Sequence, residues 1–354
     1  MKYENMSIKD AFKQCQERLF GSFNTARFAN TSKLVKDSDD GLYFSNALER
    51  IDPYLHRPLS RFYWQEAMPI LYGGGAVEFA SFFTANYNVQ DANKNAASGN
   101  GNIIATVQAS IQKHQTTVNA YAWAIEIGWI DEMKYNQVGS NILQLVDEGV
   151  RLYYNQKLDD IAFYGFVKQG VANAYGLINN AQIASQLSQV KFTDAATTPK
   201  QIVDTLNTLL AGIAQNTAYS RQYVTNHLLL PPEVYTALAQ PMTITTDGGA
   251  VFQNVLEYFK ANNYVKMLFG SDDLIILPVP YLKDAGAQVS GAATRRAVAY
   301  CYNEACVRMP LPMDLTRGAT MFDTTSMSIK TPFVAFIGSP QFVYPITLAY
   351  MDNI

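Results

Sequence analysis

The segment between Phe62 and Ile130 is almost free of charge and contains two long stretches of alternating side chains. Its charged residues are Glu66, Glu78, Asp91, Lys94, Lys113 and Glu126. In each stretch large apolar residues share one parity: Val77, Phe79, Phe83, Tyr87 and Val89, then Tyr121, Trp123, Ile125, Ile127 and Trp129. Such period-2 alternation indicates strands with one buried face. The turn-rich sequence from Asn93 to Asn102 lies between the stretches, so the segment predicts a β-hairpin.

The length of this hairpin is as informative as its pattern. Residues 119 to 130 alone would extend about 36–40 Å at about 3.3 Å per residue, whereas a usual strand has about 5–6 residues. A hairpin that long extends beyond a compact domain, so something else has to cover its surface. Because it carries little charge, we expect the cover to be protein. The expected contact residues are Phe79, Phe83, Tyr87, Lys94, Tyr121, Trp123 and Trp129.

The composition of the whole chain limits its partners. Charged residues make up 16% of the 354 residues, below the usual quarter. This deficit fits either buried subunit contacts or a merely polar surface. The formal net charge is −3, so the chain has no general attraction for nucleic acid or anionic membranes. A protein that encloses nucleic acid without binding it tightly is still compatible with this charge.

The cysteines and the N-terminal sequence indicate the cellular compartment of the chain. Cys15, Cys301 and Cys306 are an odd number without metal-ligand spacing, which is typical of reduced thiols in a cytoplasmic protein. The first ten residues lack the apolar core of a secretory signal. No run approaches the ~18–20 apolar residues of a membrane span. We therefore expect a soluble chain without disulfides.

The remaining patterns predict an α+β fold with mixed sheets. Residues 1 to about 60 contain a short helix near Ile8–Leu19 and then an extended arm, with a disordered terminus as the alternative. Apolar residues at helical spacing predict one uninterrupted helix over about 131–164. Thr198, Pro199 and Gln201 predict the start of another. Further helices are expected from Pro231 or Pro232 and over 251–262, and strands over 227–230, 274–278, 296–302 and 342–350.

No conventional active site is visible. The histidines His56, His114 and His227 have no ligand-spaced partners, so no metal site is predicted. Gly73-Gly74-Gly75 is interpreted as a hinge before the first long strand rather than as a phosphate-binding loop. Adjacent carboxylates at 159–160 are interpreted as structural, because neighbouring helix residues point about 100° apart. Those at 272–273 are interpreted as a turn before the strand that follows. Arg295, Arg296 and Arg308 are interpreted as salt-bridge partners. We predict no catalytic, cofactor-binding or metal-binding residue.

The order of the elements resembles the major capsid proteins of tailed bacteriophages, which have the Hong Kong 97-like fold. The resemblance rests on the hairpin over 76–130, the helix over 131–164, the sequence Tyr175-Gly176-Leu177-Ile178-Asn179-Asn180 and LLLPPEVYTAL at 228–238. It also includes NVLEYFKANN at 254–263 and the ending FVYPITLAYMDNI. Each motif is weak by itself, whereas their order and spacing are more specific.

The resemblance implies a domain organisation and a function. It implies an N-terminal arm at 1–61 and an extended loop (E-loop) at 62–130. A peripheral domain with a spine helix would span 131–189 and 301–354, and an axial domain 190–300. The implied function is self-assembly into pentamers and hexamers of an icosahedral or prolate shell around double-stranded DNA, in a virion assembled in the host cytoplasm. The implied partners are other copies of the chain, portal and scaffolding proteins, a decoration protein and DNA bound without sequence specificity, with no membrane and no enzymatic activity.

Two alternatives remain open at this point. An encapsulin-like compartment would have the same fold and would be distinguished by a neighbouring cargo-enzyme gene instead of portal and terminase genes. An enzyme with a β-rich lid would be supported by an activity that is lost on substitution of Asp272 or Asp273. Some members of the resembled family crosslink a loop lysine to a neighbour's asparagine. Lys94 lies near the hairpin tip, but no acceptor is identified, so this chemistry is not assigned.

Overall fold

The computed structural model describes residues 60–90, 106–137, 142–194, 196–246, 249–270, 274–289 and 292–354. The chain divides into two units, Met1–Leu59 and Ser60–Ile354, and the description below concerns the second. The expected N-terminal helix and arm, Lys94 and the pair Asp272–Asp273 lie outside the described residues.

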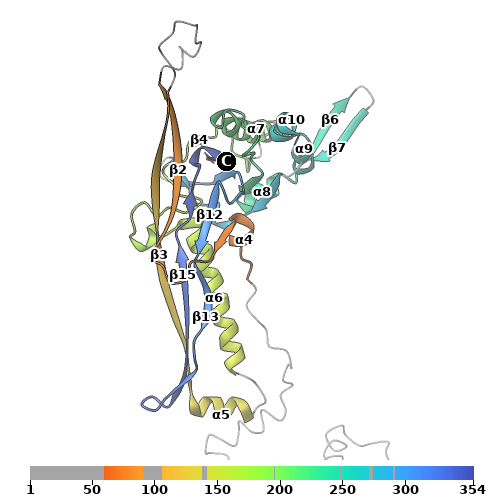
Figure 1. Ribbon diagram of the computed structural model, residues 1–354. Helices are drawn as coiled ribbons and strands as arrows, with labels where there is room; N and C mark the ends of the chain where they lie inside the picture. The colour runs from red at the N-terminus through yellow and green to blue at the C-terminus, as the bar shows by residue number, and fades with distance from the viewer. Residues whose placement is uncertain are drawn as a thin grey trace, which may run out of the picture. The chain divides into compact units, whose positions relative to one another are not determined.

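The described part contains helices and strands in the mixed order expected of an α+β protein (Figure 1). The helices are α4 (Trp64–Ala67), α5 (Trp129–Gln137), α6 (Ile142–Tyr164), α7 (Pro199–Asn216), α8 (Pro232–Ala237), α9 (Val255–Ala261) and α10 (Tyr264–Phe269), with 3-10 turns η2 (Val167–Gln169), η3 (Pro280–Leu282) and η4 (Pro345–Thr347). The strands up to the middle of the chain are β1 (Ile70–Tyr72), β2 (Phe79–Gln90), β3 (Thr106–Gly128), β4 (Ser185–Leu187), β5 (His227–Leu230), β6 (Pro241–Thr246), β7 (Gly249–Asn254) and β8 (Ile275–Pro278). The later strands are β9 (Gly286–Val289), β10 (Ala292–Thr294), β11 (Arg296–Tyr300), β12 (Val307–Leu311), β13 (Met313–Arg317), β14 (Met321–Asp323), β15 (Ser328–Gly338), β16 (Gln341–Phe342) and β17 (Leu348–Asp352).

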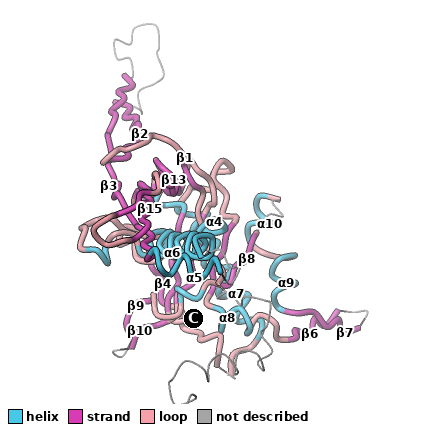
Figure 2. Tube along the Cα trace, turned by 90° about the horizontal axis from the view of Figure 1, so that it is seen from below, coloured by secondary structure: helices cyan, strands magenta, loops and turns pink. Residues whose placement is uncertain are grey.

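Strand β3 belongs to two different pairings along its length. Its first half, up to Thr117, pairs antiparallel with β2, and its second half, from Val118, pairs antiparallel with β15. The sheet order is β13-β15-β3-β2, with β14 also paired to β15. Figures 1 and 2 both show the β2–β3 ribbon on the side of the unit away from the β6–β7 ribbon.

A second five-stranded sheet, β4-β17-β11-β5-β8, lies between the two larger hydrophobic cores. Successive residues of β11 point to opposite faces, as expected for a strand. Val298 and Tyr300 belong to the core that includes α4 and α6, whereas Ala297 and Ala299 belong to the core that includes α7 and α9. Both faces of this sheet are therefore covered, which explains why β5, β11 and β17 are wholly buried.

The polypeptide turns sharply where α6 ends. Gly165 has a φ of +65°, and it forms a β-bridge with Tyr175. A Cβ atom on Gly165 would lie 2.1 Å from the carbonyl oxygen of Ala174, and one on Gly176 would lie 2.2 Å from that of Phe163. The Asn179 side chain fixes this close approach, since its Oδ1 accepts the N–H of Gly176 and its Nδ2 donates to the carbonyl of Tyr164. The Tyr-Gly-Leu-Ile-Asn-Asn sequence thus packs the chain against the C-terminal end of α6.

Several sequence predictions require correction. The single helix expected over 131–164 is wrong, because two helices, α5 and α6, occupy this region and run in different directions (Figure 1). The helix expected over 251–262 begins at Val255, and its first four residues belong to β7. The final strand expected over 342–350 is interrupted by η4, so only β17 continues to Asp352.

Other predictions are confirmed. Helix α7 begins at Pro199, and the Thr198 N–H donates to Gln201 Oε1 at 2.9 Å in a capping box. Strand β5 covers His227–Leu230 as expected. The three consecutive glycines from Gly73 all have positive φ and join β1 to the segment before β2. That backbone conformation suits glycine, and the role of this run as a hinge stays a prediction.

Candidate assembly interface

One face of the β2–β3 ribbon exposes a row of large apolar side chains, with Lys113 among them. In the antiparallel register Phe79 lies opposite Thr117, Phe83 opposite Lys113 and Tyr87 opposite Ala109. Directly opposed residues share a face, so the odd-numbered residues of both strands lie together. The exposed large apolar side chains of this face are Phe79, Phe83, Tyr87, Val107 and Ile111. Tyr87 and Ile111 are 74% and 72% exposed, so nothing in the described part of the chain covers them.

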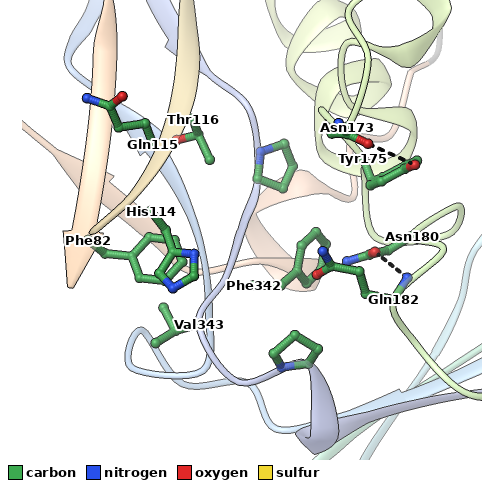
Figure 3. A pocket seen from close by; sticks show the side chains of 12 residues that line it. Phe82, His114, Gln115, Thr116, Asn173, Tyr175, Asn180, Gln182, Phe342 and Val343 are labelled. Atoms are coloured by element: carbon green, nitrogen blue, oxygen red, sulfur yellow. Dashed lines mark hydrogen bonds between the residues drawn. The ribbon is translucent and has the colours of Figure 1, made fainter. Parts of the chain in front are cut away.

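The opposite face of the ribbon packs against its own chain near the ribbon base. Phe82 stacks on His114 with ring centroids 4.9 Å apart, and Thr84 Oγ1 lies 2.9 Å from His114 Nε2. Next to this pair is a cavity of about 300 Å³ (Figure 3). Its walls combine aromatic rings, prolines and side-chain amides: Phe82, His114, Gln115, Thr116, Asn173, Tyr175, Asn180, Gln182, Pro340, Phe342, Val343 and Pro345. The two faces of the ribbon therefore differ: the even-numbered face is partly covered near the ribbon base and carries polar residues farther out, whereas the large apolar side chains lie on the odd-numbered face.

Tyr121 and Trp123 lie farther along β3 and contact the chain's own helix α6. Trp123 packs edge-to-face on Tyr153 and Tyr154, with centroids 6.4 and 5.9 Å away. The Tyr121 hydroxyl donates to Gln169 Oε1 at 2.8 Å. Burial raises the pKa of Tyr121, although its side-chain hydrogen bonds act to lower it. Both rings remain half-buried, and a role for them between subunits stays a prediction.

Trp129 belongs to a second exposed apolar surface. It is the first residue of α5 rather than a strand residue as expected, and it is 43% exposed. Its N–H donates to the Met327 carbonyl, and its ring lies edge-on to Phe322 at 6.4 Å. The exposed apolar members of this α5/β14 surface are Trp129, Ile130, Met133, Tyr135, Met321, Phe322 and Met327. Trp129 is thus about 60 Å along β3 from Ile111, at about 3.3 Å per residue.

Sequence reasoning missed most members of these surfaces. Val107 and Ile111 share the parity of Tyr121, which was the available signal, but only the apolar residues from Tyr121 onward were singled out in the second stretch. Met321, Phe322 and Met327 had no local signal, because their neighbour Trp129 is distant in sequence. The structure brings together Phe79, Phe83 and Tyr87, and it separates them from Tyr121, Trp123 and Trp129.

The charged residues singled out from the sequence have structural partners. Asp159 Oδ1 accepts the N–H groups of Tyr63 and Trp64 at 2.9 and 2.7 Å, whereas Asp160 lies 3.9 Å from Lys168. Arg295 forms a salt bridge with Glu233 and Arg296 with Asp352, as expected. Arg308 instead donates to the neutral side chain of Gln341. Within the described ranges no group of three metal-type ligands occurs. No described helix is long and apolar enough to cross a membrane.

Two buried titratable groups have shifted pKa values, and the two shifts have opposite effects on how stability changes with pH. Burial raises the pKa of Asp159 to about 6, against the lowering effect of its backbone hydrogen bonds, and it lowers the pKa of His227 to about 4. Asp159 is also next to Asp160 and the Tyr281 hydroxyl. His227 stacks between Tyr302 and Tyr300, and its Nδ1 lies 3.1 Å from Asn226 Oδ1. Folding therefore binds a proton at Asp159 and releases one from His227 over overlapping pH ranges.

We expect these two effects to oppose each other between about pH 4 and 6. Acidification stabilises the fold through Asp159, because the folded state retains the proton at higher pH than the unfolded state. It destabilises the fold through His227. Relative to the wild type, Asp159→Asn should lose more stability on acidification, by at most about 1.4 kcal/mol per pH unit, and His227→Gln should lose less. Urea midpoints of the unassembled chain at pH 4.5 and 6.5 measure this; parallel pH profiles for all three proteins would contradict it.

Solved structures with the same fold include a phage capsid and an encapsulin complex. The described fold matches a chain of "The capsid of Myoviridae Phage XM1" with a TM-score of 0.70 at 13% identity, covering 87% of this chain and 98% of that one. A chain from Mycobacterium phage Cain matches with a TM-score of 0.56 at 11% identity, covering 86% and 94%. A chain of the holo-SrpI encapsulin complex from Synechococcus elongatus PCC 7942 matches with 0.50 at 11%, covering 88% and 95%. The fold is the Hong Kong 97-like capsid fold.

Sequence comparison defines the family. The profile of the family described as major capsid protein matches residues 93–354, which is well over half of the chain. The chain belongs to the major capsid protein family. A search of curated proteins finds no match. The expected family and fold class are thus confirmed.

Proposed function

We propose that this chain is the repeating subunit of a phage shell, and that it assembles into pentamers and hexamers around double-stranded DNA. The observation that carries the proposal is the exposed apolar face of the β2–β3 ribbon. Phe79, Phe83 and Tyr87 are each more than half exposed, and a two-stranded ribbon is at best marginally stable alone in water. A neighbouring copy that covers this face would stabilise both the ribbon and the shell.

The domain roles implied by the family resemblance are part of this proposal. Residues 1–61 would act as the arm, 62–130 as the extended loop, 131–189 with 301–354 as the peripheral domain, and 190–300 as the axial domain. Stable interfaces bury roughly 1,200–2,000 Å², and loops that lie over neighbours supply such area without a larger core. Identical contacts repeated under closed symmetry then complete the shell.

The proposed partners follow from the same role. Other copies of the chain are the main partner, with portal, scaffolding and decoration proteins as accessory partners during assembly in the host cytoplasm. The net charge of −3 supports contact with DNA by enclosure rather than by tight or sequence-specific binding. We propose no enzymatic role. An encapsulin-like compartment is the second candidate, and the lower TM-score of the encapsulin match, 0.50 against 0.70, favours the phage shell.

Electron microscopy of the expressed chain, alone and with a scaffolding protein, tests the function. Closed shells are the expected product, and shells from infected cells should protect double-stranded DNA from nuclease. Monomers or small dimers under every assembly condition would contradict the proposal. Shells that hold an enzyme cargo and no DNA would favour the encapsulin alternative.

Replacing two aromatic residues of the ribbon face should prevent assembly without unfolding the subunit. In Phe83→Ser with Tyr87→Ser, each contact loses two buried aromatics, worth about 1.5–3 kcal/mol apiece. The association constant per contact should therefore fall by about 10²–10⁴. Sedimentation velocity should show monomers, and circular dichroism should show unchanged helix content. The matched control is Asn86→Ser with Asn88→Ser on the other face of β2, which should still form shells. Normal shells from the aromatic variant would contradict the proposed role of this face.

A further inference from the structure

The outer edge of β2 carries backbone groups that are ready to bind another strand. Val118 donates its N–H to the Glu78 carbonyl at 2.9 Å, and Thr116 Oγ1 donates to the Ala80 carbonyl at 3.0 Å. Even-numbered β2 residues therefore point their backbone groups toward β3. Because the register continues without a shift along β2, the odd-numbered residues point theirs away from β3. These outward groups belong to Phe79, Ser81, Phe83, Ala85 and Tyr87.

Within the described residues this edge is unpaired, and β2 carries no charged residue or proline. β2 is the terminal strand of its sheet and pairs only with β3 within the described residues. Proteins usually protect long edge strands with charged side chains or proline. The β2 sequence FASFFTANYNVQ contains neither. Ser81, Phe83, Ala85 and Tyr87 are all exposed, so both the backbone edge and the apolar side chains are available to the same partner.

The side chains along this edge are symmetric about Phe83. They alternate large and small in the order Phe79, Ser81, Phe83, Ala85, Tyr87. We propose that β2 pairs antiparallel with β2 of a second copy about a two-fold axis through Phe83. The proposal rests on the proposed function in one respect, because a second copy has to be present. It names which element of that copy binds and in which register.

The register follows from the hydrogen bonds and the side chains together. With Phe83 opposite Phe83, Phe79 lies opposite Tyr87 and Ser81 opposite Ala85, and all five residues form hydrogen-bonded pairs, with about ten backbone bonds. Aromatic residues then meet aromatic residues, the favourable cross-strand arrangement. A shift of two residues in either direction would separate the aromatics and place two of the three opposite Ser81 or Ala85. A shift of one would place the inward-pointing even residues opposite the odd ones. No charged residue lies on either β2 strand to oppose the contact.

Spin labels measure this register directly in assembled shells. Single cysteines at Ser81, Ala85, Asn86 and Asn88, in a Cys15→Ser background, leave all three aromatic residues intact. The measured distance joins a label on one copy to the same label on the paired copy. It should be about 3.3 Å multiplied by twice the number of residues that separate the labelled position from Phe83. The expected separations are about 13 Å at both 81 and 85, about 20 Å at 86 and about 33 Å at 88. Dipolar electron paramagnetic resonance measures these distances. Dilution with unlabelled subunits distinguishes the coupling within a β2–β2 pair from coupling to labels on more distant subunits.

Equal distances between paired labels at positions 81 and 85 would support the proposal, because both positions are two residues from Phe83. Distances that only rise or only fall from position 81 to position 88 would overturn it. Normal shells without dipolar coupling at these sites would also overturn it, because the edge would then be covered by another segment, such as residues 1–59. In that case the proposed shell function would still stand. Failure of the wild-type chain to form shells would instead contradict the proposed function.

A proline substitution gives an independent test. Ala85→Pro removes an N–H that points away from β3, so the β2–β3 ribbon should be retained. Pairing of the two β2 strands should be lost. Shells should then either not form or dissociate at least ten times faster in urea. Ala85→Val is the matched control, because it keeps the N–H. Shells of Ala85→Pro that are as resistant as those of Ala85→Val would overturn the proposal.

Discussion

Gly176→Ala is expected to prevent the subunit from folding. The added Cβ would lie 2.2 Å from the Phe163 carbonyl oxygen and 2.5 Å from the Gly165 amide nitrogen. These are backbone atoms at the end of α6, so no side-chain rotation relieves the clash. Substitutions of this kind cost more than about 4 kcal/mol, against a total stability of about 5–15 kcal/mol for a typical protein. Expression should give insoluble protein, measured as the soluble fraction and as the urea midpoint of any soluble chain.

Gly149→Ala is the matched control for this prediction. Gly149 lies within α6, and a Cβ there would meet no heavy atom within 4 Å. Because alanine favours helix more than glycine does, this variant should gain up to about 1 kcal/mol. Soluble Gly176→Ala protein with a wild-type urea midpoint would show that the close approach between the Tyr-Gly-Leu-Ile-Asn-Asn segment and α6 is wrong.

The second large effect is expected at the buried ion pair between Arg296 and Asp352. Arg296 Nε and Nη2 donate to the two carboxylate oxygens at 2.6 and 2.9 Å, and Nη1 donates to the Ile178 carbonyl. The guanidinium also lies over the Tyr350 ring at 4.3 Å. Burial acts to raise the pKa of Asp352, but hydrogen bonds from Arg296 and Ser185 lower it below its ordinary value. The pair joins β11, β17 and the segment after α6.

Arg296→Met should destabilise the subunit by about 3–5 kcal/mol, because it leaves the buried carboxylate without its cation. The double variant Arg296→Met with Asp352→Leu should recover part of this loss, since no isolated charge remains. Arg61→Met is the matched control. Arg61 pairs with Glu66 at the surface, where such pairs contribute about 0–1 kcal/mol. Denaturant unfolding measures all three, and equal losses for Arg61→Met and Arg296→Met would contradict the argument.

The sequence predicted the elements whose signals are local. Alternation identified the hairpin, the capping residues Thr198 and Gln201 located α7, and the apolar run at 227–230 defined β5. Interruptions were missed where the local pattern continued across them. Helical spacing ran from α5 into α6, and the apolar run near the C-terminus concealed η4. The family resemblance came from the order of elements, which does not depend on such boundaries.

The candidate interface was predictable only in part, because exposure depends on contacts between distant residues. Phe79, Phe83 and Tyr87 could be identified from one strand. Tyr121 and Trp123 share the same pattern, yet α6 covers one side of their rings. Nothing in the local sequence distinguishes a strand residue covered by its own helix from one left open. The α5/β14 surface required the pairing of β15 with β3, which brings Met327 beside Trp129.

The continuity of β3 has a mechanical consequence. One unbroken strand of 23 residues is fixed to β15 at one end and carries the ribbon at the other, so it can act as a lever. The other strand of the ribbon, β2, reaches the body through three glycines with positive φ, and the N–H groups of Gly73 and Gly75 donate to the carbonyls of Leu311 and Pro312. A torque that a neighbour exerts on the ribbon would therefore be transmitted through β3 to the packing of Trp123 on α6, and through the glycine segment to the end of β12.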